Sequence, residues 1–287
     1  MQQAHPVRMR LLHVAPERMG AVPKTSAARS FPPLLIASCV FLFISGFFLS
    51  RFPDVEGASY ASYGFNLLIA LPAFIAIVRQ FGAGRGIAAL AAVSVFGYLI
   101  EGFGVATHVP YGEFYYGDPL GPTILGLVPY LLPLSYVPLV IGAVAVVSGT
   151  GTMLRRIVLG GLLLVVIDGV LDPGAASLGF WIWPGGGPYY GVPLSNFGGW
   201  LISGLIASAL VTWIGGRRLI DRPLRPGLLD SLLISMVLWL SVCIFSGLVF
   251  PALLAAALIL LIGRRRAQLV RSLRSLPRGS VDAVPGS

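Results

Sequence analysis

Charged residues are scarce in this sequence of 287 residues, and their scarcity excludes an ordinary soluble domain. Only 11% of the residues are Asp, Glu, Lys or Arg, and 56% are hydrophobic, whereas a soluble domain carries roughly a quarter charged residues. Several apolar runs exceed the roughly 18–20 residues that span a bilayer core. The sequence therefore predicts an all-α fold, a polytopic bundle of about eight transmembrane helices.

Cysteine and histidine are also rare. Cys39 and Cys243 both lie in apolar runs, which suggests neither a disulfide framework nor a metal site. His5 and His13 lie near the N-terminus, so His108 is alone in the body of the chain. Histidine clusters with metal-ligand spacing are therefore missing, which argues against di-iron membrane hydroxylases, desaturases and ketolases and against zinc proteases. We predict no metal and no cofactor.

Motifs for nucleotides and diphosphates are missing as well. No GxGxxG or P-loop lies at a strand-to-helix junction, so a bound nucleotide is not expected. Asp168 and Asp172 could form half of an Asp-rich magnesium motif, but a second cluster is absent. The net charge of +9 could suggest a nucleic-acid partner, but in a membrane protein the positions of the basic residues are more informative than their sum. No nucleic-acid partner is predicted. Two classes of function remain after these exclusions: proton transfer to an apolar substrate, and a non-enzymatic role in the membrane.

The apolar runs divide the chain into three parts. Residues 1–30 are predicted to form a basic cytoplasmic tail, residues 31–263 the transmembrane helical domain, and residues 264–287 a second basic cytoplasmic tail. The run 230–262 would be about 50 Å long as one helix and would exceed a bilayer core of about 30 Å, so we divide it near Ser246-Gly247. The predicted helices are 33–50, 58–78, 86–106, 123–147, 157–172, 194–214, 229–246 and 248–263.

The positions of the basic residues support this topology. With the N-terminus inside, the arginine clusters between the helices fall on the inner side, as the positive-inside rule expects. Of the 20 Lys and Arg residues, only Arg51 then falls outside. Both termini are therefore predicted to be cytoplasmic, in a multi-pass integral protein of a bacterial plasma membrane.

Three acidic residues are predicted to lie in the outer half of the membrane. Counted from the preceding arginines on the inner side, Glu101 and Asp168 lie at depths of about 24 and 18 Å in a core of about 30 Å. Asp172 follows Asp168 by four residues, so both lie on one helix face. The two segments that carry these acids are expected to converge near the outer interface.

These acids have few cations to pair with. Only Arg51 and His108 are expected in the outer half, and Glu113 and Asp118 are interpreted as solvated loop residues. Acids inside a membrane indicate function by default, with structural hydrogen bonding as the alternative. Burial without a cation favours the neutral carboxylic acid, which can donate a proton to a weakly basic substrate. The candidate catalytic acids are Glu101, Asp168 and Asp172.

Other candidates have more than one interpretation each. His108 is a pH-sensitive loop residue, the partner of an aspartate, or a catalytic base. Asn196 either caps a helix N-terminus or orients a water molecule. The aromatic residues of the outer connections form an interface belt, or they line a substrate site, because ring faces attract the positive charge of a cationic intermediate. These aromatic candidates are Tyr111, Tyr115, Tyr116, Trp181, Trp183, Tyr189 and Tyr190.

Two sequence blocks resemble the bacterial and archaeal membrane carotenoid hydratases. The first, Pro110-Tyr111-Gly112-x-Phe114-x-Tyr116 with Leu120-Gly121-Pro122, is similar to the family pattern Pro-Phe-Gly-x-Tyr-x-Tyr…Leu-Gly. In the family this pattern also follows a helix that ends Glu-x-x-Gly. Tyr111 and Phe114 are aromatic exchanges relative to the pattern. The second block contains Asp168-x-x-x-Asp172-Pro173, Trp181-x-Trp183, Tyr189-Tyr190-Gly191-Val192-Pro193 and Asn196-Phe197-x-Gly199-Trp200.

The resemblance implies a carotenoid biosynthesis enzyme that adds water across the C1′=C2′ double bond of a carotenoid ψ-end and leaves a tertiary 1′-hydroxyl. Lycopene and γ-carotene carry such an end, and archaeal relatives use C50 chains of the bisanhydrobacterioruberin type. A polyene substrate, the lipid bilayer and other carotenoid-pathway enzymes are the implied partners. Two other interpretations stay open. One is a membrane carotenoid cyclase that protonates the same end, and the other is a non-enzymatic lipid transporter or binding protein.

Overall fold

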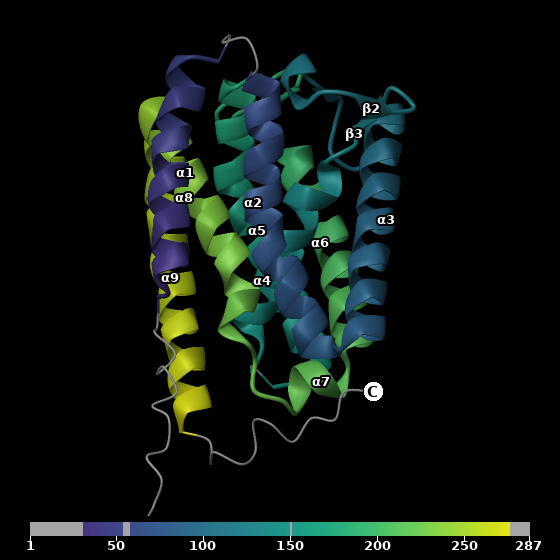
Figure 1. The fold of residues 1–287 in the computed structure, drawn as a ribbon. Helices are drawn as coiled ribbons and strands as arrows, with labels where there is room; N and C mark the ends of the chain where they lie inside the picture. The colour runs from purple at the N-terminus through teal and green to yellow at the C-terminus, as the bar shows by residue number, and fades with distance from the viewer. Residues whose placement is uncertain (1–30, 54–57, 150, 276–287) are drawn as a thin grey trace, which may run out of the picture.

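The computed structural model describes residues 31–53, 58–149 and 151–275, with side chains described from residue 63 onward in the second range. The predicted N-terminal tail and residues 276–287 lie outside these ranges. Within them the chain forms a bundle of long helices, with short strands in the loops at one end (Figure 1). We call this end, which carries residues 108–131 and 178–193, the loop end.

The long helices correspond to the predicted ranges, and among the described residues five of them are long and apolar enough to cross a membrane. The fold is thus an all-α membrane helix bundle, whereas the number of spans and the cytoplasmic position of the termini stay predictions. The helices are α1 (Pro33–Arg51), α2 (Ala58–Phe81), α3 (Ala83–Thr107), α4 (Leu132–Val147), α5 (Met153–Ser177), α6 (Leu194–Gly215), α7 (Arg217–Ile220), α8 (Asp230–Phe245) and α9 (Val249–Arg274). The short elements are β1 (Tyr115–Tyr116), η1 (Asp118–Leu120), β2 (Thr123–Ile124), β3 (Val128–Pro129), β4 (Trp181–Ile182) and η2 (Pro226–Leu229).

The predicted start of the fourth helix, at residue 123, is wrong. Leu125 and Gly126 have φ angles of 53° and 71°, and they turn the chain into the antiparallel β2–β3 hairpin. The helix begins only at Leu132, with Pro133 in its first turn. A proline is well accommodated there because the first backbone N–H groups of a helix have no partner within the helix.

Two predicted helix ends are also wrong. Helix α5 continues beyond residue 172 to Ser177 with Pro173 in its interior. Every residue from Ile167 to Ala175 is buried. The Gly169 carbonyl, which loses its helical donor at Pro173, accepts a hydrogen bond of 2.8 Å from the Tyr189 hydroxyl instead. Helix α9 continues beyond residue 263 to Arg274, through the basic residues that were assigned to a tail.

The predicted break between the last two helices is confirmed. Helix α8 ends at Phe245 and α9 begins at Val249. Between them Gly247 has a φ of 72°, a conformation that glycine adopts without steric cost.

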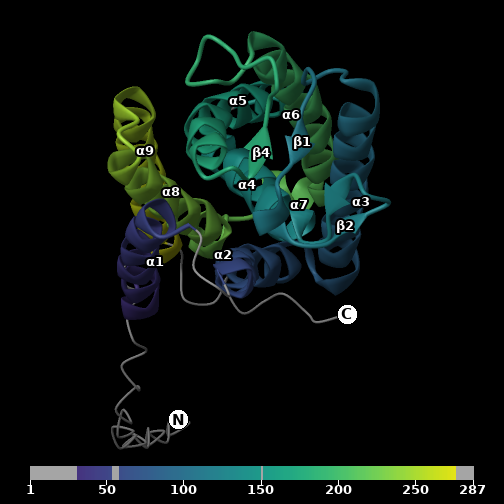
Figure 2. The ribbon, with the colours of Figure 1, turned by 90° about the horizontal axis from the view of Figure 1, so that it is seen from above.

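The helices form two groups. Figure 2 shows α3, α4, α5 and α6 on one side and α1, α8 and α9 on the other, with α2 beside both. Small residues allow the closest contacts, as is usual between membrane helices. A Cβ atom on Gly160 of α5 would lie 2.7 Å from the Ser208 hydroxyl of α6. In the other group the Ser241 hydroxyl of α8 donates a hydrogen bond of 2.5 Å to the Phe43 carbonyl of α1.

The two loops at the loop end are tied to each other and to the helices. Strands β1 and β4 pair antiparallel, with Tyr116 opposite Trp181. The buried ring of Tyr111 lies between α3 and α6, where it leaves no room for side chains on Gly104 and Gly199. These contacts place the first loop directly over the space between α3, α5 and α6.

Substituting Gly199 tests this docking. Gly199→Ala would force a methyl group into the Tyr111 ring, and we expect a loss of about 1–3 kcal/mol of stability, the usual cost of overpacking. The matched control is Gly198→Ala, because a Cβ atom there meets no other atom within 4 Å. Thermal unfolding in detergent should show a lower midpoint for the first variant only. Equal midpoints would contradict the packing described.

Candidate active site

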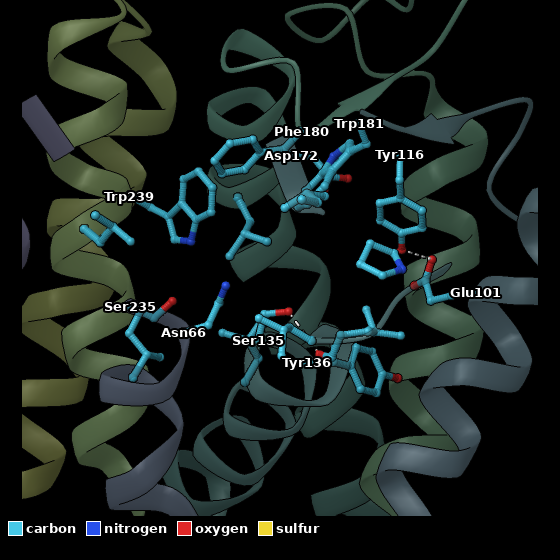
Figure 3. A pocket seen from close by; sticks show the side chains of 18 of the residues that line it. Asn66, Glu101, Tyr116, Ser135, Tyr136, Asp172, Phe180, Trp181, Ser235 and Trp239 are labelled. Carbon is cyan, nitrogen blue, oxygen red and sulfur yellow. Dashed lines mark hydrogen bonds between the residues drawn. The ribbon is translucent and has the colours of Figure 1, made fainter. Parts of the chain in front are cut away.

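A cavity of about 130 Å³ lies beneath the two loops of the loop end. Residues of α1, α2, α3, α4, α5, α6 and α8 line it together with both loops, and Figure 3 shows its polar and aromatic side chains. Most of the wall is aliphatic or aromatic. Among the described residues that line it there is no lysine, arginine or histidine. Two carboxyl groups, those of Glu101 and Asp172, lie in this wall.

Glu101 lies near the loop end of α3 and is only 6% exposed. The hydroxyl of Tyr116 donates a hydrogen bond of 3.0 Å to its Oε2 atom (Figure 3). Because Tyr116 lies in β1, the pairing of β1 with β4 positions this donor. The first loop therefore both closes the cavity and orients the carboxyl group of Glu101.

Asp168 and Asp172 share one donor. The side-chain nitrogen Nδ2 of Asn196 donates to Oδ2 of Asp168 at 3.0 Å and also to Oδ2 of Asp172. All three side chains are buried. Because both oxygens lie within hydrogen-bond distance of one nitrogen, they are at most roughly 6 Å apart.

The two aspartates nevertheless differ in position. Asp172 lines the cavity, whereas Asp168 lies one helical turn deeper and does not. Oδ1 of Asp168 is buried without a donor among the described residues. The prediction that Asn196 could cap its helix is wrong, because Pro193 occupies the N-cap of α6 and the Asn196 amide donates to the acids instead.

Aromatic side chains complete the wall on the side of the acids. Tyr111, Tyr116, Trp181 and Trp183 all line the cavity, as expected for a substrate site. Burial, with a smaller contribution from Glu101, raises the pKa of Tyr111 above the usual range of a tyrosine. Its hydroxyl therefore stays protonated and can act as a donor.

Besides Asp168, four predicted residues lie outside the cavity wall. His108 is exposed at the C-terminal end of α3, and Tyr115 and Tyr190 are 48% and 43% exposed. Tyr189 donates from its hydroxyl to the Gly169 carbonyl at 2.8 Å. The structure thus gives Tyr189 a role in holding the second loop on α5, and it brings none of these four residues into the wall beside Glu101 and Asp172.

Sequence reasoning missed several residues of the wall. Tyr136 of α4 lies against the ring of Trp200, with 5.8 Å between the ring centroids. Asn66 of α2 and Ser235 and Trp239 of α8 line the side remote from Glu101 (Figure 3). Each is a single polar or aromatic residue inside an apolar run. The only signal that could have found them is a polar group in a membrane helix.

The polar groups of the site are suited to proton transfer. Among the described residues, no group of three or more His, Cys, Asp or Glu side chains is close enough to hold a metal ion. The carboxyl groups are held instead by an amide and a phenol, which are neutral donors. An apolar space bordered by two oriented carboxyl groups can deliver a proton to, and accept one from, a hydrocarbon end.

The fold and this site define a class, a membrane helix bundle with buried acids beside an apolar cavity. The profile of the family described as carotenoid biosynthesis protein matches residues 62–262, and the chain belongs to this family. It is 34% identical over 247 residues to a bisanhydrobacterioruberin hydratase of Haloarcula japonica, covering 84% of this chain and 77% of the relative. No solved structure shows significant similarity to the chain. The carotenoid hydratase-like family inferred from the two motifs is confirmed.

Removing the donor to Glu101 tests the hydrogen bond at the site. Tyr116→Phe leaves the ring contacts in place but leaves a buried carboxyl oxygen without its partner, so we expect a loss of about 1–3 kcal/mol of stability. Tyr115→Phe is the matched control, because this neighbouring side chain is 48% exposed. Thermal unfolding of both variants in detergent checks the difference. A Tyr116→Phe variant as stable as the control would show that the bond contributes nothing.

Proposed function

We propose that the protein hydrates the C1′=C2′ double bond of a carotenoid ψ-end of the lycopene or γ-carotene type, as a multi-pass enzyme of the plasma membrane. The observation that carries this proposal is the presence of Glu101 and Asp172 in one apolar wall whose described residues include no cation. The relative from Haloarcula, named a hydratase, supports the reaction class.

The size of the cavity supports a substrate that inserts only its end. Pockets for whole drug-sized ligands measure roughly 300–1,000 Å³, and this cavity measures about 130 Å³. A C40 polyene is about as long as the bilayer core is thick, roughly 30 Å. One end of such a chain can therefore reach the acids while the remainder stays among the helices or in lipid.

The first step is protonation of the alkene. In the resting enzyme Glu101 is the neutral acid, because a buried carboxyl group without a cation is more stable uncharged. It transfers its proton to C2′, the C1′=C2′ π bond supplies the electron pair, and a tertiary cation forms at C1′. As Glu101 becomes an anion, the hydrogen bond from Tyr116 strengthens, so this donor stabilises the transition state more than the ground state.

The cation then lies between negative charge and aromatic rings. Asp168 and Asp172 both accept from one amide nitrogen, and repulsion between two anions so close together allows at most one of them to be ionised. In this scheme the pair holds one proton and one negative charge, and the Asn196 amide stabilises that charge. This charge, together with the faces of Trp181, Trp183 and Tyr111, stabilises the positive charge at C1′.

Water capture completes the reaction. A water molecule bonds to C1′ through its oxygen and gives up one proton to Asp172, which leaves the tertiary alcohol. His108 is not needed as the base, because it lies outside the cavity wall. Return of the proton from Asp172 to Glu101 restores the resting state. Addition of water changes no oxidation balance, so the scheme requires no redox cofactor.

The product identifies the reaction. Cells that accumulate lycopene and express this protein should form a pigment that is heavier than lycopene by one water molecule, as determined by mass spectrometry of the extracted carotenoids. A cyclase would use the same protonation step, but its product has the mass of lycopene. A product that is an isomer of lycopene with unchanged mass would therefore show cyclase activity and not hydratase activity. Recovery of lycopene alone would contradict both proposed activities.

Substitution of the two acids tests their roles. Glu101→Gln and Asp172→Asn keep the side-chain shape but remove proton transfer, which contributes typically 10²–10⁴-fold, so we expect hydration to fall by at least about 100-fold. Glu113→Gln and Asp118→Asn are the matched controls, because these carboxyl groups are exposed in the first loop and do not line the cavity. Near-normal product from both acid variants, at equal amounts of folded protein in the membrane, would refute the assignment.

A further inference from the structure

A second polar group of side chains lies in the same cavity, on the side away from Glu101. Asn66 of α2 and Ser235 and Trp239 of α8 line the wall there, and Figure 3 shows the side chains of all three directed into the space between these helices. Ser235 and Trp239 are four residues apart, so they lie on one face of α8. We call Asn66, Ser235 and Trp239 the polar triad.

The polar triad has no partner among the described residues. The other buried hydroxyl groups of α8 do have partners: Ser231 accepts from the backbone N–H of Ala73 at 2.9 Å, and Ser241 donates to the Phe43 carbonyl. In contrast, the Asn66 amide, the Ser235 hydroxyl and the Trp239 N–H make no hydrogen bond within the described part of the chain. Ser235 and Trp239 are 4% and 9% exposed.

Unpartnered polar groups at this depth are costly. A buried polar group without a hydrogen bond costs roughly 1–3 kcal/mol, and lipid offers no replacement partner. Two such residues, Ser235 and Trp239, are directed into one small space together with the half-buried Asn66, and a ligand that all three bind best explains this arrangement.

The chemistry of the polar triad defines that ligand. The indole N–H of Trp239 only donates, whereas the Asn66 amide and the Ser235 hydroxyl both donate and accept. No charged side chain lies among the described residues on this side of the cavity wall, so a charged ligand would be unpaired there. A neutral oxygen that donates one hydrogen bond and accepts up to two, as a hydroxyl group or a water molecule can, matches all three groups.

We propose that Asn66, Ser235 and Trp239 form a subsite that binds a neutral hydroxyl-type oxygen, carried by the polyene or by a water molecule. The inference rests on the proposed function for the presence of a polyene end in the cavity. A polyene hydroxyl bound at the polar triad belongs to an end that is already hydrated, so in this case the subsite holds the product. A water molecule bound there is held ready for the cation.

Polyene binding tests the subsite without requiring turnover. The probes are lycopene and 1-hydroxylycopene, and each is titrated into the detergent-solubilised protein while quenching of tryptophan fluorescence is followed. Asn66→Leu and Ser235→Ala each remove hydrogen-bonding groups, and Ser235→Ala removes a single hydroxyl, so it is the milder test of folding. Ser94→Ala is the matched control, because this α3 hydroxyl donates to Leu90 of its own helix and lies outside the cavity wall.

If the polyene carries the bound hydroxyl, both variants should weaken binding of 1-hydroxylycopene by about 5- to 10-fold and leave the Kd of lycopene unchanged. If water is the ligand, both Kd values stay unchanged, and the rate of lycopene hydration at saturation falls at least about 5-fold. Either result supports the subsite, provided that Ser94→Ala behaves as wild type.

Unchanged binding together with an unchanged hydration rate in both variants overturns the subsite. A wild-type protein that binds both polyenes but hydrates neither refutes the proposed function instead. In that case the binding measurement alone decides. A loss of affinity of both variants for 1-hydroxylycopene but not for lycopene supports the subsite. Equal losses of affinity for the two polyenes, or no loss for either, overturn it.

Discussion

Carboxyl groups buried at membrane depth need hydrogen bonds from neutral donors, and the rest of this structure is arranged around that requirement. Asn196 satisfies both aspartates of α5 from the first turns of α6, and Tyr116 satisfies Glu101 from a loop. These bonds join α5 to α6 and the first loop to α3. The contacts that orient the acids are therefore also contacts that hold the loop end together.

Hydrophobicity and charge spacing predicted most of the architecture, because the bilayer sets the length of an apolar helix. The errors fall where local backbone geometry decides. Positive φ at Leu125 and Gly126 makes a hairpin out of an apolar run. The Tyr189 hydroxyl replaces the backbone donor that α5 loses at Pro173, so this helix continues through the proline. Hydropathy contains no information on either effect.

The site was predictable in part for a similar reason. Glu101 and Asp172 could be placed together because acids are rare in an apolar chain and helix length sets their depth. His108 was included on residue type alone, and the structure leaves it exposed at a helix end. Asn66 and Ser235 were missed because two polar residues on distant helices become meaningful only when packing directs them into the same space.

The proposed hydration depends on transfer of a proton from a buried acid to a carbon atom, and isotope labelling tests this step most directly. Lycopene hydrated by the protein in D₂O, then washed in H₂O to exchange the hydroxyl, should retain one deuterium bound to C2′, located by mass spectrometry and NMR. An alcohol without carbon-bound deuterium would contradict protonation of the alkene.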